Sequence, residues 1–347
     1  MITARKIHIN GIVQGVGFRP FVYSLAKRYN LTGWVRNSSA GVDIVANGEL
    51  DALNKFLENL QYQSPPLSQI DEFLVEEISV NGFDEFTIIA SETIKGEFIP
   101  VSPDVSICDD CLAELRDPND RRYRYPFINC TNCGPRFTII KDIPYDRRLT
   151  TMASFSMCPN CRAEYEDPLN RRFHAQPVAC PECGPHIWFE FSDNEKTIEK
   201  EAALQTARDL IREGKILAIK GLGGFHLACD ASNSRAVDAL RSRKRRSDKP
   251  FALMVLDVET ARKYCEISES EQELLESSAK PIVILTRRDE IQLPDFVAPN
   301  VKTLGIMLPY TPIHYLLLEK AEGFPEILVM TSGNLSDEPI VYTNETA

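Results

Sequence analysis

The chain has 347 residues, enough for two or three domains, and 43% of them are hydrophobic. Its formal net charge of −11 argues against a nucleic-acid partner for the chain as a whole. No run approaches the roughly 18 apolar residues of a membrane helix, and no apolar signal segment follows Met1. These features predict a cytoplasmic protein without a membrane partner.

The first of three predicted segments, residues 1–90, has the pattern of a small α/β domain. The stretch from Lys6 to Ile9 alternates polar and apolar residues, which is typical of a half-buried strand. The patterns that follow predict a helix over residues 21–29, strands at 33–37 and 42–46, a helix over 50–60 and a strand at 73–78. This β-α-β-β-α-β order is that of the ferredoxin-like split motif.

A glycine-rich loop joins the first strand to the first helix. Gly11, Gly15 and Gly17 allow the backbone to present several N–H groups toward one point before a helix N-terminus, which favours an anion site. Arg19, in the first helical turn, can add a bidentate contact to a phosphate, and Asn37 on a neighbouring strand can orient a water. The alternative is a tight strand–helix turn with a surface arginine.

The same residues carry a resemblance to a known family. The sequence from Gly11 to Arg19, followed by Gly33 to Asn37, resembles the acylphosphatase signature, and the similarity covers nearly all of residues 5–90. In that family the arginine binds the acyl phosphate and the asparagine positions the attacking water, which implies catalytic roles for Arg19 and Asn37. The resemblance also implies a phosphate cradle formed by Gln14, Gly15, Val16, Gly17 and Phe18.

The second segment, residues 91–196, holds eight of the ten cysteines in two repeats of paired Cys-x-x-Cys motifs. Eighteen residues separate the two pairs of each repeat, and the second repeat is the first shifted by fifty positions. Two such turns close a tetrahedron of four thiolates, which predicts two structural zinc ions in a mostly irregular backbone. The predicted ligands are Cys108, Cys111, Cys130 and Cys133 for one ion and Cys158, Cys161, Cys180 and Cys183 for the other.

Other ligand arrangements stay open for this segment. The twenty-four residues between the repeats also permit zinc ligands to be exchanged between them. His174 and His186 flank the last cysteine pair, and either could replace a cysteine ligand. The remaining thiols, Cys229 and Cys265, lie outside the repeats and are predicted to be buried.

The third segment, residues 197–347, again alternates helix and strand. From Arg241 to Lys249 it places six cations in nine positions of an otherwise acidic chain. Such a density of charge suits the phosphates of ATP, while a solvated helix face or a nucleic-acid patch is the alternative. His226, which follows a glycine loop, and His314 are expected beside the nucleotide.

The third segment resembles the YrdC family of ATP-dependent carbamate-activating domains. The signature of that family pairs Lys-x-Arg with Ser-x-Asn, and a glycine loop follows a strand before it. The resemblance implies that ATP, with Mg²⁺, and carbamate are bound by Lys220, Lys244, Arg246, Ser332 and Asn334.

Together the three segments resemble the HypF family of carbamoyltransferases, which mature [NiFe]-hydrogenases. The implied fold class is α+β and multidomain: an acylphosphatase domain, two four-cysteine zinc fingers and a YrdC-like α/β domain. The implied chemistry is hydrolysis of carbamoyl phosphate, activation of carbamate by ATP to carbamoyl adenylate, and transfer to the C-terminal cysteine of the protein HypE for cyanide-ligand synthesis. The transferase domain is expected to be absent from this chain, and the YrdC-like domain to be incomplete at Ala347.

Two other classes of function remain for this sequence. One is an acyl-phosphate hydrolase whose zinc domains only bind partners, and the other is a YrdC-like factor of tRNA modification. The acylphosphatase signature and the duplicated cysteines favour the maturation enzyme over the tRNA factor. Pyrophosphate exchange that requires carbamoyl phosphate would distinguish the maturation enzyme from the hydrolase.

Overall fold

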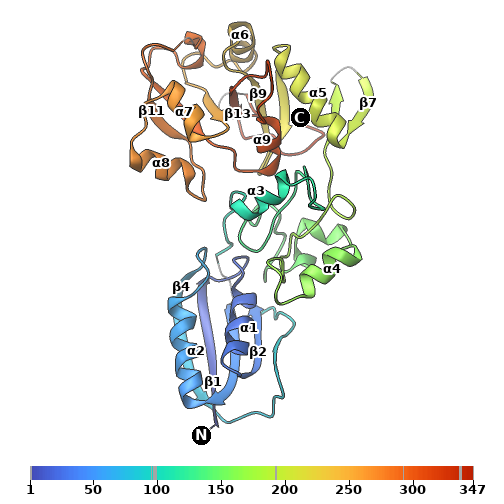
Figure 1. The fold of residues 1–347 in the computed structure, drawn as a ribbon, viewed down its shortest axis with the longest axis vertical. Helices are drawn as coiled ribbons and strands as arrows, with labels where there is room; N and C mark the ends of the chain where they lie inside the picture. Colours follow the sequence, from blue (N-terminus) through green and yellow to red (C-terminus); the bar gives the residue numbers. More distant parts are fainter. Residues whose placement is uncertain are drawn as a thin grey trace. The chain divides into compact units, whose positions relative to one another are not determined.

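The computed structural model describes residues 2–94, 96, 100–191, 194–291, 293–335 and 338–346. The chain forms two compact units, one of residues 1–105 and 128–185 and the other of residues 106–127 and 186–347. Figure 1 follows the chain through the helices and strands of each unit.

The first unit is built on a five-stranded sheet with the strand order β4-β1-β3-β2-β5. Its strands pair antiparallel, except that β2 and β5 are parallel. The elements are β1 (Ile2–Ile12), α1 (Phe18–Arg28), β2 (Thr32–Ser38), β3 (Gly41–Glu49), α2 (Leu50–Tyr62), β4 (Gln69–Ile78) and β5 (Phe86–Ile88). The predicted β-α-β-β-α-β order is present, and β5 is a short edge strand that the sequence pattern did not indicate.

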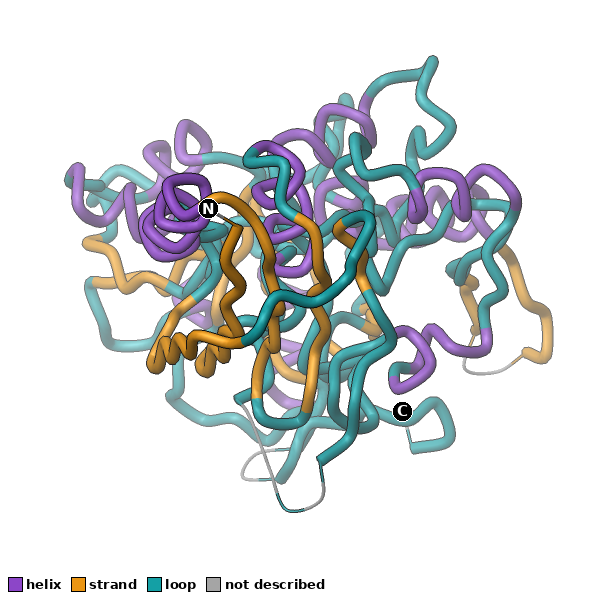
Figure 2. The backbone as a smooth tube through the Cα atoms, turned by 90° about the horizontal axis from the view of Figure 1, so that it is seen from below, coloured by secondary structure: helices purple, strands orange, loops and turns teal. Residues whose placement is uncertain are grey.

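Helices α1 and α2 cover one face of this sheet, in which β1 begins beside the N-terminus (Figures 1 and 2). Leu53, Phe56 and Leu60 recur at helical spacing on α2 and are fully buried. They pack in one core with Ile7 of β1 and Val22 of α1. Burial of each large apolar side chain stabilises the fold by about 1.5–3 kcal/mol. This packing holds the glycine-rich loop at one end of the sheet.

The cysteine repeats consist mainly of loops and turns, as predicted, with one short helix in each. Helix α3 (Asp109–Arg116) begins directly after Cys108, and α4 (Pro159–Glu166) begins directly after Cys158. Two short 3-10 helices, η1 (Arg147–Leu149) and η2 (Thr151–Ser154), lie between the repeats. The equal offset of the two α-helices shows that the sequence repeat is also a structural repeat.

The second unit is built on a six-stranded sheet with the order β11-β12-β10-β13-β9-β8. Among its described strands, β10 and β12 pair in parallel and the other neighbours pair antiparallel. Its elements after α3 are β6 (Trp188–Phe191), β7 (Asn194–Glu199), α5 (Lys200–Arg212), β8 (Leu217–Lys220), β9 (Phe225–Asp230), α6 (Ser234–Arg243), β10 (Ala252–Val255), α7 (Val258–Tyr264), α8 (Glu269–Glu276), β11 (Val283–Thr286), η3 (Asp295–Val297), β12 (Thr303–Met307), α9 (Pro312–Leu317) and β13 (Ile327–Ser332). Cys229 and Cys265 lie in its core, fully buried as predicted.

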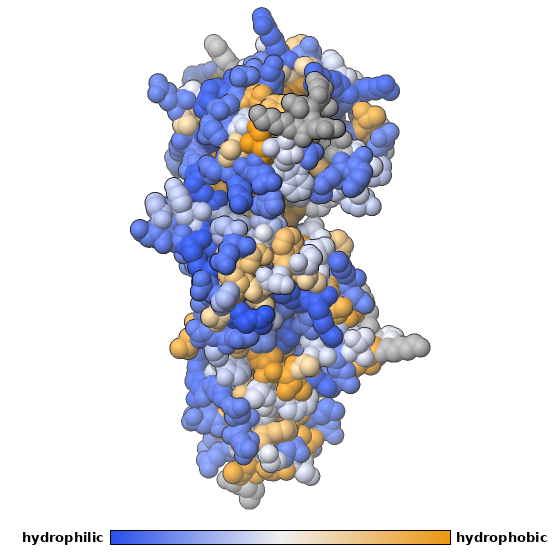
Figure 3. All heavy atoms as spheres, turned by 90° about the vertical axis from the view of Figure 1, so that its right-hand side faces the viewer, coloured by the Kyte–Doolittle hydropathy of each residue, from blue (hydrophilic) through white to orange (hydrophobic). Residues whose placement is uncertain are grey.

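The surface is predominantly polar on the face drawn in Figure 3, where hydrophobic residues form small scattered groups. Large exposed apolar side chains such as Tyr62 and Leu169 come from separate parts of the sequence. None of the helices that the structure describes is long and apolar enough to cross a membrane.

Candidate active site and metal clusters

The loop between β1 and α1 contains two left-handed glycines. Gly15 has a φ of 73°, and Gly17, which precedes α1, has a φ of 77°. Residues with a Cβ are strained in this region of backbone space. A Cβ on Gly15 would also lie 3.1 Å from Cδ of Arg136. Glycine is therefore needed here both for the conformation of the loop and for its close approach to a neighbouring side chain.

The other predicted cradle residues hold this loop in place through their side chains. Val16 and Phe18 are buried in the core of the first unit. The amide nitrogen of Gln14 donates to the carbonyls of Ser38 (2.7 Å) and Gly41 (2.8 Å). A buried side chain with two backbone acceptors rigidifies the loop, because leaving either acceptor unpaired would cost about 1–3 kcal/mol.

Arg19 lies in the first turn of α1 and is only 9% exposed. Its Nη2 is 2.9 Å from a carboxylate oxygen of Asp146 and donates to the carbonyl of Tyr145 at 3.3 Å. Its Nη1 donates to the hydroxyl of Ser91 at 3.3 Å. These contacts fix the direction of the guanidinium, so the predicted phosphate-binding residue is preorganised by partners outside the acylphosphatase signature.

Asn37 lies near the end of β2 and is 1% exposed. Neither Oδ1 nor Nδ2 of its side chain has a hydrogen-bond partner among the residues that the structure describes. A buried amide without partners costs free energy, so such a group indicates a place where a small polar molecule completes the hydrogen bonds. This is the position at which the sequence predicts the attacking water.

A small cavity that is open to solvent brings these residues together. Gln14, Gly15, Gly17, Arg19 and Asn37 form one side of it. The other side comes from the cysteine repeats and the stretch between them: Thr131, Arg136, Tyr145, His174, Ala175, Gln176 and Pro177. Sequence reasoning did not place these residues at the site. One sequence feature could have indicated His174: the second repeat has histidine at this position, whereas the first repeat has arginine, Arg124, at the equivalent one.

Arg136 connects the glycine loop to the first cysteine repeat. It is 1% exposed, and its Nε donates to the carbonyl of Gly15. The same guanidinium donates to the carbonyls of Thr131 (2.9 Å), Cys133 (2.9 Å) and Cys130 (3.3 Å). A planar group with five donors can hold several carbonyls at fixed angles. The conformation of the Cys130–Cys133 turn is therefore transmitted to the backbone of the phosphate loop.

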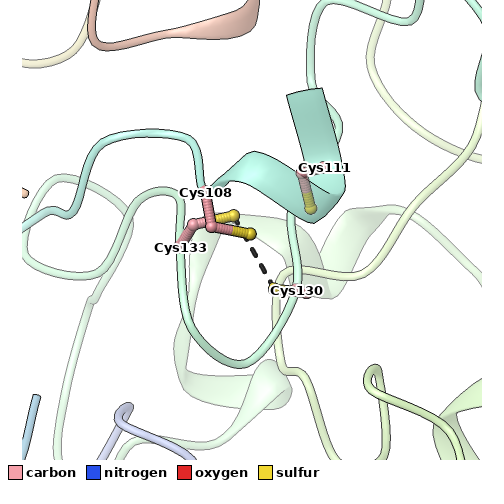
Figure 4. Close-up of side chains that lie close together, drawn as sticks. All are labelled: Cys108, Cys111, Cys130 and Cys133. Carbon is pink, nitrogen blue, oxygen red and sulfur yellow. Dashed lines mark hydrogen bonds between the residues drawn. The ribbon is translucent and has the colours of Figure 1, made fainter. Parts of the chain in front are cut away.

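The eight repeat cysteines form two clusters, each drawn from one repeat. Within each cluster the four sulfur atoms lie within 4.8 Å of one another. Figure 4 shows the first cluster, in which the side chains of Cys108, Cys111, Cys130 and Cys133 converge. The grouping is the within-repeat one and not the crossed one. Both clusters found among the described residues consist of cysteines alone, so neither His174 nor His186 replaces a ligand.

The sulfur separations suit a tetrahedral metal. Zinc–sulfur bonds of about 2.3 Å place the ligands of a tetrahedron about 3.8 Å apart. The sulfurs of Cys130 and Cys133 are 3.8 Å apart, and that of Cys180 is 3.8 Å from Cys158 and 3.7 Å from Cys183. These separations exclude disulfides between those pairs, since an S–S bond is about 2.05 Å long.

We expect elemental analysis to find two zinc ions per chain and Cys130→Ser to retain one. The variant should also lose hydrolysis at the glycine-loop cavity, because Arg136 is held by the carbonyls of the Cys130–Cys133 turn. Cys229→Ala is the matched control, since Cys229 lies outside both clusters, and it should keep two ions. A single ion in the unaltered protein would contradict the assignment.

In the second unit, the predicted Lys-x-Arg and Ser-x-Asn residues meet. Lys244 directly follows α6, is 3% exposed, and its Nζ donates to the carbonyls of Ser332 and Asn334, both at 2.6 Å. Nζ also donates to Oδ1 of Asn334 at 3.0 Å. Burial, and after it the nearby Arg246 cation, lowers the pKa of Lys244. An anion beside this lysine would favour its charged form.

Arg246 and Arg241 have different roles within the basic run. Nη1 of Arg246 is 3.5 Å from the hydroxyl of Thr331 on β13, and its guanidinium lies 5.0 Å from the ring of Phe251. Arg241 donates to the carbonyls of Phe296 (2.9 Å) and Arg246 (3.0 Å). The run is thus not a uniform clamp of six cations: Arg241 organises the loop on which Arg246 lies.

The remaining predicted residues of this unit are Lys220 at the end of β8, His226 on β9 and His314 on α9. Lys220, at the end of β8, donates to Oδ1 of Asn344 at 2.7 Å. His226 on β9 has its Nε2 3.4 Å from the hydroxyl of Tyr310. The ring of His314 lies 4.6 Å from that of Tyr310, and burial lowers the pKa of His314 to about 3. The two histidines predicted beside the nucleotide therefore share one aromatic cluster.

Comparison with known proteins gives matches along nearly the whole chain. Family models match for acylphosphatase at residues 5–88, for the HypF finger at 107–140 and 157–190, and for telomere recombination (Sua5/YciO/YrdC) at 209–347. The chain is 49% identical, over 99% of its length, to the carbamoyltransferase HypF2 of Cupriavidus necator and to the carbamoyltransferase HypF of Synechocystis. The chain belongs to the HypF family, and its domains follow the order of that family.

Solved structures agree with this assignment. A crystal structure of full-length HypF in the phosphate- and nucleotide-bound form covers 99% of the chain at 51% identity, with a TM-score of 0.92. That of T. kodakarensis HypF covers 99% at 48% identity, with a TM-score of 0.90. The predicted fold class and the predicted resemblance to HypF are confirmed. The chain spans 44% of the length of each of these four HypF proteins.

Proposed function

We propose that this chain carries out two successive reactions of a carbamoyltransferase. The first is hydrolysis of carbamoyl phosphate to carbamate and phosphate at the glycine-loop cavity. The second joins carbamate to ATP, as its Mg²⁺ complex, giving carbamoyl adenylate and pyrophosphate at the basic run of the second unit. The observation that carries the proposal is the buried amide of Asn37, which lies in the same cavity as Arg19 and has no hydrogen-bond partner among the described residues.

In the proposed hydrolysis Arg19 binds the phosphate and Asn37 holds the attacking water. The water oxygen bonds to phosphorus, and the bond from phosphorus to the carbamoyl oxygen breaks with its electron pair leaving on carbamate. The proton of the water passes to the phosphate. Arg19 stabilises the charge that collects on the transferring group, because its guanidinium is already oriented by Asp146 and Tyr145.

In the proposed activation a carbamate oxygen attacks the α-phosphorus of ATP, and pyrophosphate leaves with the electrons of the broken bond. Lys244 and Arg246 would stabilise the negative charge that develops on the phosphates. The contacts of Lys244 with Ser332 and Asn334 keep the cation beside the polar end of β13. Lys220 is proposed as a further ligand of ATP or carbamate.

The two cysteine clusters are proposed to hold structural zinc. Four thiolates complete a tetrahedron, so the ion would have no open position for substrate. Zinc would supply stability to the loops around it, since ligand binding and folding are coupled in such small sites. Residues 1–90, 91–196 and 197–347 are the proposed limits of the hydrolytic, zinc-binding and ATP-binding domains.

The destination of the carbamoyl group is also part of the proposal. The family resemblance favours the C-terminal cysteine of HypE as the acceptor, with the product used for the cyanide ligand of [NiFe]-hydrogenase in the cytoplasm. Because the matched HypF proteins are more than twice as long as this chain, transfer is assigned to the part of those proteins that this chain does not match.

ATP–pyrophosphate exchange on this chain tests the proposal. We expect exchange that depends on carbamoyl phosphate, together with release of inorganic phosphate. Phosphate release without exchange would leave an acyl-phosphate hydrolase whose other domains bind partners. Absence of both reactions in the zinc-loaded protein would contradict the proposed function.

A further inference from the structure

The two cysteine repeats place different side chains at one equivalent corner. Arg124 and His174 are fifty positions apart, and both are left-handed, with φ of 55° and 54°. The N–H of Arg124 donates to the carbonyl of Leu115 at 2.9 Å, and that of His174 donates to the carbonyl of Tyr165 at 3.0 Å. The corner therefore has the same backbone structure in both repeats, while the side chain at its centre differs.

The arginine at this corner forms ion pairs with two carboxylates. Arg124 pairs with Glu201 at 2.8 Å and with Glu319 at 2.7 Å. These carboxylates raise its pKa, so it is a permanent cation. His174 lines the cavity of Arg19 and Asn37. The duplicated scaffold thus has a structural ion pair in the first repeat and, at the same corner of the second, a residue that lines the candidate active site.

Two aromatic rings and a side-chain amide hold the corner at His174 in place. Its ring centroid lies 5.0 Å from that of Tyr165 and 4.6 Å from that of Phe173. Its carbonyl accepts from the amide of Gln176 at 2.6 Å, and that amide also donates to the hydroxyl of Tyr165 at 3.0 Å. Ring packing and the amide fix the loop without using the imidazole nitrogens.

The imidazole nitrogens of His174 are suited to a neutral hydrogen-bonding partner. Nδ1 is buried and has no hydrogen-bond partner in the described part of the chain. Burial, followed by the charge of Arg19, lowers the pKa of His174 to about 4, so the ring is neutral near pH 7. A neutral imidazole has one donor and one acceptor nitrogen, whereas phosphate is better bound by a cation such as Arg19.

We propose that His174 contacts the acyl half of the substrate and selects an amide-bearing acyl group. This inference rests on the proposed hydrolysis of carbamoyl phosphate. A carbamoyl group offers an NH₂ donor, which the unprotonated nitrogen of a neutral imidazole can accept. An acetyl group offers the carbonyl but no donor. A site built to accept a hydrogen bond discriminates against a substrate that lacks the donor, because its own polar group is then left unpaired.

The test compares carbamoyl phosphate with acetyl phosphate as substrates of the zinc-loaded protein. His174→Phe retains the ring contacts and removes both nitrogens, so kcat/KM for carbamoyl phosphate should fall about 10-fold or more. For acetyl phosphate kcat/KM should change by less than about 3-fold. His174→Asn should keep most of the preference, because asparagine tolerates the left-handed conformation and supplies both a donor and an acceptor.

Inhibition by inorganic phosphate separates acyl recognition from a structural role. The inhibition constant should be unchanged in both variants, since the phosphate half of the site is untouched. His186→Phe is the matched control, because His186 is exposed and lies outside the cavity. Equal losses with both substrates, or weaker inhibition by phosphate, would overturn the role of His174 in acyl selection. An unaltered protein that hydrolyses neither substrate would overturn the proposed function itself.

Discussion

Arg19→Ala is expected to reduce carbamoyl-phosphate hydrolysis by about 100-fold or more, because it removes a charge-assisted contact to the transferring phosphoryl group. Arg19 is 9% exposed, and Asp146 and Tyr145 align its guanidinium. A cation from the solvent-exposed surface therefore cannot take its place beside the phosphoryl group. Arg19→Lys keeps the charge but loses the planar fork, and it should recover part of the activity. Release of inorganic phosphate is the measurement.

The arginine prediction needs two comparisons. Arg28 lies on the same helix in an exposed position, so Arg28→Ala should leave hydrolysis unchanged. Asn37→Ala should lose turnover while retaining inhibition by inorganic phosphate, since the amide is proposed to hold the water and not the phosphate. Near-normal hydrolysis by folded Arg19→Ala would contradict the assignment of this cavity as the acyl-phosphate site.

The double substitution Lys244→Ala with Arg246→Ala is expected to abolish ATP–pyrophosphate exchange. It removes two cations where the α-, β- and γ-phosphates are proposed to bind, beside the polar end of β13. Calorimetry with ATP should show the corresponding loss of affinity. In the unaltered protein, affinity should weaken as salt is added, because salt screens the attraction between the basic run and the phosphates.

Hydrolysis at the Arg19 cavity serves as the folding control for this double variant. It should be retained, since none of the residues that line that cavity belongs to the second unit. Lys215→Ala, an exposed lysine that follows α5, should leave both reactions unchanged. If the double variant bound ATP as tightly as the unaltered protein, the basic run would be a solvated surface and not a nucleotide site.

Local sequence patterns were sufficient for much of this molecule. The spacing of apolar residues predicted the β-α-β-β-α-β order, and the glycines predicted the loop that ends at α1. The paired cysteines predicted both clusters, because a Cys-x-x-Cys turn brings its two thiolates together within one short segment. Lys244 and Ser332 were paired by resemblance to a family motif, and the structure brings them within 2.6 Å.

The wall of the cavity around Arg19 and Asn37 was decided by tertiary structure alone. Arg19 meets Asp146 across 127 positions, and Arg136 meets Gly15 across 121. No periodicity in the sequence predicts either pairing, since helix and strand patterns indicate only which residues of one element share a face. For the same reason the sequence around His174 indicated only its nearness to the cysteine ligands. Its place in one cavity with Arg19 and Asn37 is a long-range arrangement that exists only when the chain folds.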